Sequence, residues 1–419
     1  MKQIFELSVA DETAIERIEA ASDAMVERTV SWSKVNTGST NTDGLKAFAP
    51  TLADAYSELD AEVVLQDAVP FEMVNQSGKI ETIDTGPILR VNARPDAPVQ
   101  VVMSGHYDTV FPPHAGFNDV TDLGHGRLNG PGLADMKGGL CLMLEALKTF
   151  EASAAKELIG YQIVVTPDEE IGNFASAGAL TEAASSGALI GMTYEPCMES
   201  GAMSGGRKGS AVYDVVFRGR AAHAGRSHAE GRSAIAAAAL FTAGIENLNG
   251  RYEGVTLNTG KIDGGNAVNI VPDLAIVRFG ARAPDAEAAA WTDAQIRQLM
   301  AEIEKRDGIS AHIHGGFYRP PKPRNSAQQA LFDAVAGTGQ AIGLDLEFID
   351  TGGVCEGNNI FAAGVPNVDT LGVLGGRIHS TEEFVETSSF AKRGALSALL
   401  LNRLADGRID AKAIKDMMP

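Results

Sequence analysis

Five side chains of the kinds that bind divalent metal ions follow β-rich or glycine-rich segments of this chain. They constrain its fold more than any other feature. They are His106 in SGHYDTV, Asp135 in NGPGLADMKGG, Glu170 in TPDEEIG, Glu195 in TYEP and His379 in RIHS. Two imidazoles and three carboxylates suit a hydrolytic site for two metal ions, because one carboxylate can bridge while each ion takes two further ligands. The chain is therefore predicted to be a dinuclear zinc hydrolase.

The segments that carry these side chains alternate between predicted strands and helices. After an N-terminal helix from Glu12 to about Val35, strands are expected at 87–91, 99–104, 159–166 and 189–194, with a helix at 136–150. Such alternation favours an α/β domain with a mostly parallel sheet. Ligands bind beyond the carboxyl ends of the strands in such sheets. His106, Glu169, Glu170 and Glu195 stand where strands end, so the sheet would bring them together.

A different pattern begins at about residue 207. Strands are expected at 210–218, 255–262, 274–281 and 310–316, with helices at 232–247 and 285–305. This β-α-β-β-α-β order is that of a ferredoxin-like unit. Because His379 follows this unit, the first domain is predicted to be discontinuous. It would comprise residues 1–206 and 318–419, and residues 207–317 would form an inserted second domain.

Length, charge and cysteine content restrict the class of protein. A chain of 419 residues can form two domains with separate cores. Its net charge of -19 would repel nucleic acid and anionic lipid surfaces. The first residues lack the apolar stretch of a signal peptide, and no later segment offers the roughly 20 apolar residues of a membrane span. The three cysteines imply neither a disulfide framework nor a thiolate zinc site. We expect a cytoplasmic protein with no nucleic-acid or membrane partner.

The order of the metal-binding motifs resembles that of the co-catalytic zinc exopeptidases of clan MH. This family includes glutamate carboxypeptidase, aminoacylase, acetylornithine deacetylase and succinyl-diaminopimelate desuccinylase. The resemblance runs from about residue 30 almost to the C-terminus and is closest to glutamate carboxypeptidase. Its most specific parts are H-x-D at His106 and Asp108, D-M-K-G-G from Asp135, D-E-E ending at Glu170, and the late His379. Any one of these motifs is weak alone, whereas four in this order are specific.

The resemblance implies a role for each residue of the predicted metal site. His106 and Glu195 would bind one Zn²⁺, Glu170 and His379 the other, and Asp135 would bridge; Co²⁺ or Mn²⁺ could substitute. Asp108 would orient the His106 imidazole by accepting its second N–H. Glu169 is predicted to be the general acid/base. When two carboxylates follow one another at a strand end, one can coordinate a metal ion while the other moves the proton of a water molecule.

The inserted domain carries further motifs that resemble those of the family. His223 in AAHAG and Asn269 in GNAVNIVP correspond to lid residues that reach the substrate or its oxyanion, usually from the neighbouring subunit. The resemblance therefore implies a lid that also forms a homodimer through residues 207–317. Arg282 and Arg319 would bind a substrate carboxylate, for which a guanidinium group is well suited. Arg278 is an alternative to Arg282, and surface ion pairing is an alternative role for the arginines. Turn formation is an alternative role for His223 and Asn269.

Three departures from the family pattern leave the substrate side chain open. Glu356 stands in TGGVCEGNN where the family usually has an aspartate, and Gly280 and Ala281 precede Arg282 where D-x is usual. A lysine expected shortly after Glu195 in a glutamate-selective enzyme is missing, unless Arg207 or Lys208 replaces it.

The sequence leaves three functions open. The first is an exopeptidase that cleaves the amide bond beside a free carboxylate and releases a C-terminal amino acid, with an acidic residue as one option. The second is a deacylase or deacetylase of N-acyl amino acids. The third is a metal-binding dimer that has lost catalysis, against which Glu169 and His223 argue. The substrate is thus expected to be a small peptide or an N-acyl amino acid.

Overall fold

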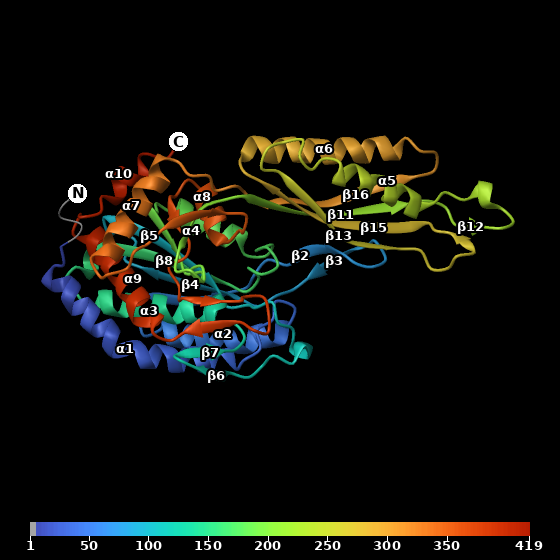
Figure 1. The fold of residues 1–419 in the computed structure, drawn as a ribbon. Helices are drawn as coiled ribbons and strands as arrows, with labels where there is room; N and C mark the ends of the chain where they lie inside the picture. The colour runs from blue at the N-terminus through green and yellow to red at the C-terminus, as the bar shows by residue number, and fades with distance from the viewer. Residues whose placement is uncertain (1–5) are drawn as a thin grey trace.

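The computed structural model describes residues 6–419, and it divides into two units that lie side by side (Figure 1). The larger unit is built on a six-stranded sheet with the strand order β1-β4-β8-β5-β9-β18. These strands are β1 (Glu62–Gln66), β4 (Ile88–Ala93), β8 (Ile159–Thr166), β5 (Val99–His106), β9 (Ile190–Thr193) and β18 (Asn367–Val368). Strands β8, β5, β9 and β18 are parallel, which confirms the predicted mostly parallel sheet. β4 is the exception, since it runs antiparallel to both β1 and β8.

Helices cover both faces of this sheet, as the residues of its central strands require. On β8 the side chains of Tyr161, Ile163 and Val165 join one core, whereas Val164 points into another. This alternation is that of a strand buried on both faces. The first face is covered by α1 (Val9–Ser33), α3 (Gly138–Glu151) and α9 (Ser389–Ala405), and the second by α4 (Ala177–Ser185) and α8 (Glu356–Ala362).

The N-terminal helix begins earlier than predicted. Ser8 accepts a hydrogen bond from the backbone N–H of Asp11, whose side chain in turn accepts one from the N–H of Ser8. This reciprocal capping starts the helix at Val9 instead of Glu12. The remaining helices of the larger unit are α2 (Thr42–Tyr56), α7 (Ser326–Gln340) and α10 (Ala411–Lys415).

The second unit follows the β-α-β-β-α-β order predicted from the sequence. Its elements are β11 (Gly209–Arg218), α5 (Ala234–Glu246), β13 (Thr256–Gly264), β15 (Leu274–Ala283), α6 (Ala286–Glu304) and β16 (Ser310–Arg319). The strands form an antiparallel sheet in the order β13-β15-β11-β16, and α5 and α6 pack on it around a separate hydrophobic core. A small pair, β12 (Ala222–His223) and β14 (Ile270–Val271), lies at the end farthest from the larger unit (Figure 1).

A hairpin of the larger unit contacts the second unit. It consists of β2 (Phe71–Val74) and β3 (Ile80–Ile83). Val74 packs against Val216 and Ile276 of the second sheet, and the Arg218 guanidinium donates to the carbonyl of Gly78 at 2.9 Å. No periodicity in the sequence indicates this contact.

Short strands complete the larger unit around the ends of its central sheet. β10 (Met203–Arg207) pairs with β17 (Phe348–Thr351), and the others form a sheet in the order β19-β20-β7-β6. The latter are β6 (Thr121–Gly124), β7 (Arg127–Asn129), β19 (Gly375–Gly376) and β20 (Phe384–Glu386). Among residues 6–419, no helix is both long enough and apolar enough to span a membrane.

Candidate active site

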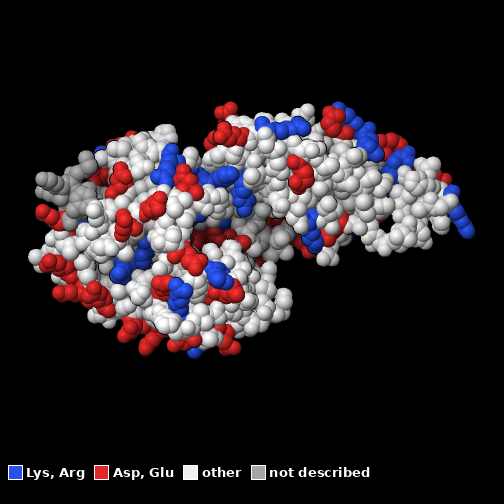
Figure 2. Space-filling view, in the orientation of Figure 1, with Lys and Arg blue, Asp and Glu red and all other residues white. Residues whose placement is uncertain are grey.

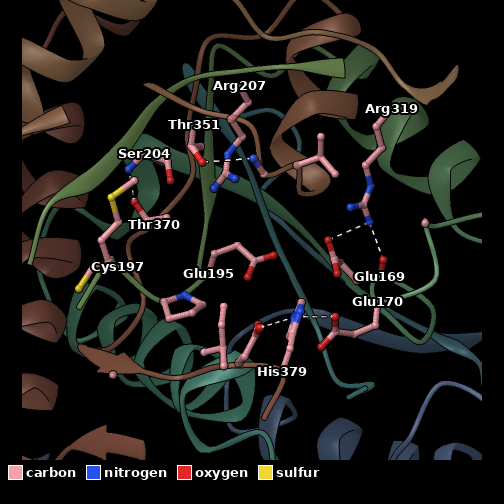
Figure 3. Close-up of a pocket in the computed structure, with 18 of the residues that line it drawn as sticks. Glu169, Glu170, Glu195, Cys197, Ser204, Arg207, Arg319, Thr351, Thr370 and His379 are labelled. Atoms are coloured by element: carbon pink, nitrogen blue, oxygen red, sulfur yellow. Dashed lines mark hydrogen bonds and ion pairs between the residues drawn. The ribbon is translucent and has the colours of Figure 1, made fainter. Parts of the chain in front are cut away.

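A cavity of about 700 Å³ opens where the carboxyl ends of the central strands face the second unit. Figure 2 shows acidic side chains deep in the hollow between the two units, with basic side chains on its rim. The cavity wall includes residues from both units, and Figure 3 shows several of them directed inward. This is the position expected for a ligand site in a mostly parallel sheet.

His106 is the last residue of β5 and is fully buried. Its Nδ1 lies 3.0 Å from the backbone oxygen of Asp108 and 3.4 Å from the Asp108 carboxylate. The Asp108 carboxylate also accepts hydrogen bonds from the backbone N–H groups of Glu169 and Glu170, at 3.0 and 3.2 Å. Asp108 therefore lies against the imidazole through both its backbone oxygen and its carboxylate, and its carboxylate also holds the turn that follows β8; its orienting role stays a prediction.

Asp135 lies between the two histidines. The short segment Leu133–Lys137 precedes α3, and Asp135 departs from helical geometry there, with φ -115° and ψ 90°. One carboxylate oxygen lies 3.2 Å from Nε2 of His106, and the other lies 3.3 Å from Nε2 of His379. Each oxygen of this carboxylate thus faces a different imidazole, which is the arrangement a bridging ligand needs.

The structure brings all five predicted metal-binding side chains together in two clusters. His106, Asp135 and Glu195 offer ligand atoms within 4.8 Å of one another, and so do Asp135, Glu170 and His379. Glu195 lies 3.8 Å from His106, and Glu170 lies 3.1 Å from His379. His379 comes from the loop between β19 and β20 and is the most exposed of the five, at 54%. Imidazole and carboxylate ligands in two clusters that share one carboxylate fit a metal site.

The pKa shifts in these clusters show the effect of burying several carboxylates close to one another. Burial and then the charge of Asp135 raise the pKa of Glu170 to about 8, and burial raises the pKa of Glu195 to about 7. Hydrogen bonds to Asp135 and Glu170 raise the pKa of His379 to about 11. Burial lowers the pKa of His106, but hydrogen bonds to Asp108, Asp135 and Glu195 outweigh burial and raise it well above its ordinary value. Such repulsion between carboxylates is relieved by bound cations.

Glu169 belongs to neither cluster, although it adjoins both. One of its carboxylate oxygens lies 4.0 Å from His106, and the other forms an ion pair with Arg319 at 2.8 Å (Figure 3). Arg319 is only 4% exposed and also donates to the side-chain oxygen of Asn173 at 2.7 Å. Asn173 itself was not predicted, and no signal in TPDEEIGNF distinguishes it from an ordinary turn residue.

The other predicted arginines occupy different environments. Arg282, near the end of β15, lines the cavity and donates to the hydroxyl of Ser210 at 2.6 Å. Arg278 instead forms ion pairs within the second unit, to Asp214 at 2.8 Å and to Asp263 at 3.4 Å. Arg278 is not among the residues that line the cavity, so Arg282 is the better placed of the two.

Arg207 and Lys208, the two residues that could replace the missing lysine, also differ in their surroundings. Arg207 is buried and lines the cavity beside Thr351 (Figure 3). Its guanidinium pairs with the buried carboxylate of Asp369. Lys208 points away and donates to the carbonyl of Gly254 at 2.6 Å. Glu356, the departure from the family aspartate, is fully buried and accepts a hydrogen bond from Thr166 at 2.5 Å.

His223 and Asn269 lie outside this cavity. They belong to the small β12–β14 region at the far end of the second unit, where the N–H of Ala224 donates to the carbonyl of Asn269 (Figure 1). His223 is exposed, and its Nδ1 accepts hydrogen bonds from the backbone N–H groups of Gly225 and Arg226 at 3.1 and 3.2 Å. Within one chain these two residues therefore do not reach the clusters.

Comparisons with known proteins agree with this geometry. Residues 102–403 match the model of peptidase family M20/M25/M40. Carboxypeptidase G2 from Pseudomonas sp. (strain RS-16) is 26% identical over 318 residues, which are 74% of each chain. Succinyl-diaminopimelate desuccinylase from Nitrosococcus oceani is 27% identical over 70% of this chain and 80% of that relative.

Among solved structures, the fold is similar to that of the Bacillus subtilis YXEP protein, a dinuclear metal binding peptidase from the M20 family. The TM-score is 0.59 at 15% identity, over 91% of this chain and 99% of the other. At this identity the likeness concerns the fold. The chain belongs to peptidase family M20/M25/M40, because the family model matches most of its length. This confirms the resemblance seen in the sequence and the prediction of a metal-binding hydrolase that acts on C–N amide bonds.

Proposed function

We propose that this protein is a two-zinc exopeptidase that cleaves the amide bond beside a free carboxylate and releases a C-terminal amino acid. The observation that carries the proposal is the pair of ligand clusters that share Asp135 on the wall of a cavity that also holds Arg207, Arg282 and Arg319. In a chain with a net charge of -19, Arg282 is a local attraction for an anionic substrate, because it donates to the Ser210 hydroxyl, whereas Arg207 and Arg319 already pair with the carboxylates of Asp369 and Glu169. The relationship to carboxypeptidase G2 supports the same reaction.

The donor set suits the proposed ions. His106 and Glu195 would hold one Zn²⁺, Glu170 and His379 the second, and Asp135 would contact both; Co²⁺ or Mn²⁺ could substitute. Imidazole and carboxylate ligands are typical of catalytic zinc, and neither ligand cluster contains a cysteine. When bound, the ions supply positive charge that acidifies a water molecule and polarises the substrate carbonyl.

Glu169 is proposed to be the general acid/base. Its side chain reaches the cavity between the two clusters without belonging to either, so it is free to accept a proton from water and pass it to the leaving amine. The ion pair with Arg319 fixes the orientation of the carboxylate. This contact also means that Arg319 can bind a substrate carboxylate only by sharing its guanidinium with Glu169.

Arg282 and Arg319 are proposed to bind the substrate carboxylate, and Arg207 supports a preference for an acidic group. A substitution of Arg282 by alanine should raise KM for an N-acyl glutamate with little change in metal content. Lysine at the same position should restore part of the affinity, since it keeps the charge but loses bidentate geometry. An unchanged KM in the alanine variant would show that Arg282 does not contact the substrate.

Residues 207–317 are proposed to form a lid and dimerisation domain, with residues 1–206 and 318–419 as the catalytic domain. The position of His223 and Asn269 far from the clusters of their own chain supports a role in the site of a second copy. Exposed apolar side chains on the same unit support a contact surface there; they are Ile235, Leu240, Ile262, Val268 and Ile270. His223 would then donate a hydrogen bond to the oxyanion, and Asn269 would contact the substrate.

A deacylase of N-acyl amino acids is the second candidate, favoured by the relationship to succinyl-diaminopimelate desuccinylases. Both reactions break an amide bond beside an α-carboxylate, so the metal site serves either. Mass spectrometry of products from matched panels of dipeptides and N-acyl amino acids, with zinc-loaded protein, separates them. If the zinc-loaded protein cleaves neither panel, the result favours the third candidate, a metal-binding dimer without catalysis. The cytoplasmic location stays a prediction.

A further inference from the structure

Glu383 is not one of the proposed ligands, yet its carboxylate is hydrogen-bonded to the segment that carries Asp135. It lies between His379 and β20, and its side chain is only 1% exposed. Its carboxylate accepts three backbone hydrogen bonds, from Gly132 at 3.1 Å, from Ala134 at 3.0 Å and from Asp135 at 3.1 Å. A buried carboxylate with three N–H donors is a strong and specific contact, because each bond is charge-assisted.

These three donors need an external partner. The segment begins at Gly132 in the left-handed region, with φ 66°, and Asp135 and Met136 depart from helical geometry before α3 starts. The N–H groups in such a segment cannot be satisfied by a regular helix, and leaving them unpaired in a buried place costs about 1–3 kcal/mol each. Glu383 therefore stabilises the irregular conformation that directs the two oxygens of Asp135 toward two different histidines.

Glu383 also belongs to the loop that carries His379. The backbone oxygen of Glu383 accepts hydrogen bonds from the Asn129 side chain at 2.7 Å and from the N–H of Gly130 at 3.3 Å. The side chain and the main chain of Glu383 thus join the loop after β19 to the segment that precedes α3. The 3.3 Å approach of Asp135 to His379 depends on that junction.

We infer that Glu383 is a positioning residue that holds Asp135 between the two clusters and sets its distance from His379. It touches neither the substrate nor the reacting atoms. The inference rests on the proposed metal site, but it does not depend on which amide is cleaved. It predicts that loss of the Glu383 carboxylate weakens metal binding, beyond any general loss of stability.

The test compares Zn²⁺ affinity, measured by competition with a chromophoric chelator, for metal-free wild type, Glu383→Ala and Glu383→Gln. Alanine removes all three hydrogen bonds. Glutamine keeps an oxygen for Ala134 and Asp135 but turns an amide N–H₂ toward the N–H of Gly132. Affinity should fall about 10- to 100-fold in the alanine variant, the range for lost partners of metal ligands, and less in the glutamine variant.

Two matched controls separate positioning from stability. Glu382→Gln changes the adjacent carboxylate, which is exposed and pairs with Arg377 at the surface, and should leave affinity unchanged. Asp11→Asn breaks a buried ion pair with Arg408 far from the site and should lower the melting temperature without lowering affinity. A Glu383→Ala variant that binds Zn²⁺ within about twofold of wild type, or loses affinity only as much as Asp11→Asn does, overturns the inference.

A second readout needs neither metal nor substrate. Hydrogen exchange of the metal-free protein should show faster exchange in a peptide covering residues 129–140 for Glu383→Ala than for wild type, because the amide groups of Gly132, Ala134 and Asp135 lose their partner. Unchanged exchange there overturns the inference as well. If the wild-type protein binds Zn²⁺ but cleaves no amide, the proposed reaction fails, while the affinity and exchange results still decide the role of Glu383.

Discussion

Replacing Glu169 by glutamine should separate catalysis from metal binding. Glutamine has nearly the same shape as glutamate but cannot take a proton from water. A positioned general base contributes about 100- to 10,000-fold to turnover. The loss of this function should raise the barrier by about 3–5 kcal/mol, since each tenfold in rate corresponds to about 1.4 kcal/mol. We therefore expect kcat to fall at least about 100-fold.

Metal content should not change in this variant, because neither ligand cluster includes Glu169. Some loss of stability is expected, since the buried ion pair with Arg319 at 2.8 Å is broken. Removing one partner of a buried pair costs about 3–5 kcal/mol, and this is an upper bound here because the glutamine oxygen can still accept from Arg319. Turnover should thus be measured well below the melting temperature of the variant.

The assay combines kcat on an N-acyl amino acid with metal analysis of the same sample. Glu170→Gln is the matched control, since the neighbouring carboxylate belongs to the second cluster and its loss should reduce bound metal as well as rate. Near-native turnover of Glu169→Gln would refute the role of Glu169. A loss of activity in proportion to a loss of metal would refute the division of labour between the two carboxylates.

Three further predictions follow from the geometry of the site. Asp135→Ala should lose metal from both clusters, and retention of both ions on metal analysis would show that Asp135 does not bridge. Zn²⁺ binding at pH 7 should release protons, because hydrogen bonds to Asp135 and Glu170 raise the pKa of His379 to about 11, so this imidazole is protonated in the metal-free protein. Affinity should therefore fall as pH falls from 8 to 6, and calorimetry in two buffers of different ionisation enthalpy that showed no proton release would contradict this. Mixing inactive Glu169→Gln chains with inactive His223→Ala chains should restore some activity if the lid completes the partner's site, whereas mixed dimers that form but stay inactive would exclude such sharing.

The sequence predicted the elements that periodicity and spacing determine. The expected strand at 159–166 is β8, and the six expected elements of the second unit all occur in order. Three of the predicted metal-binding residues, His106, Glu170 and Glu195, meet because the strands β5, β8 and β9 run parallel, so their carboxyl ends share one edge. Asp135 and His379 reach the same edge from the segment before α3 and from the loop between β19 and β20. The antiparallel direction of β4 could not be predicted, because alternation of apolar residues carries no information on strand direction.

Side-chain pairing was the part that motifs could not predict. A motif gives the position of Arg319, but its rotamer and its ion pair with Glu169 depend on Asn173 and on the packing between the two units. The contacts of Glu383 depend on loops far apart in sequence that meet only in the fold. The earlier start of α1 is different, because the spacing of Ser8 and Asp11 is a capping signal within the sequence itself.

Titration of metal-free protein with Zn²⁺, with hydrolysis of an N-acyl amino acid followed at each step, tests the central claim most directly. The two clusters that share Asp135 predict that activity rises until two ions are bound per chain and then stays constant. The products should be a free amino acid and the acid released from the other side of the amide. Full activity with a single ion per chain, or with none, would contradict the account.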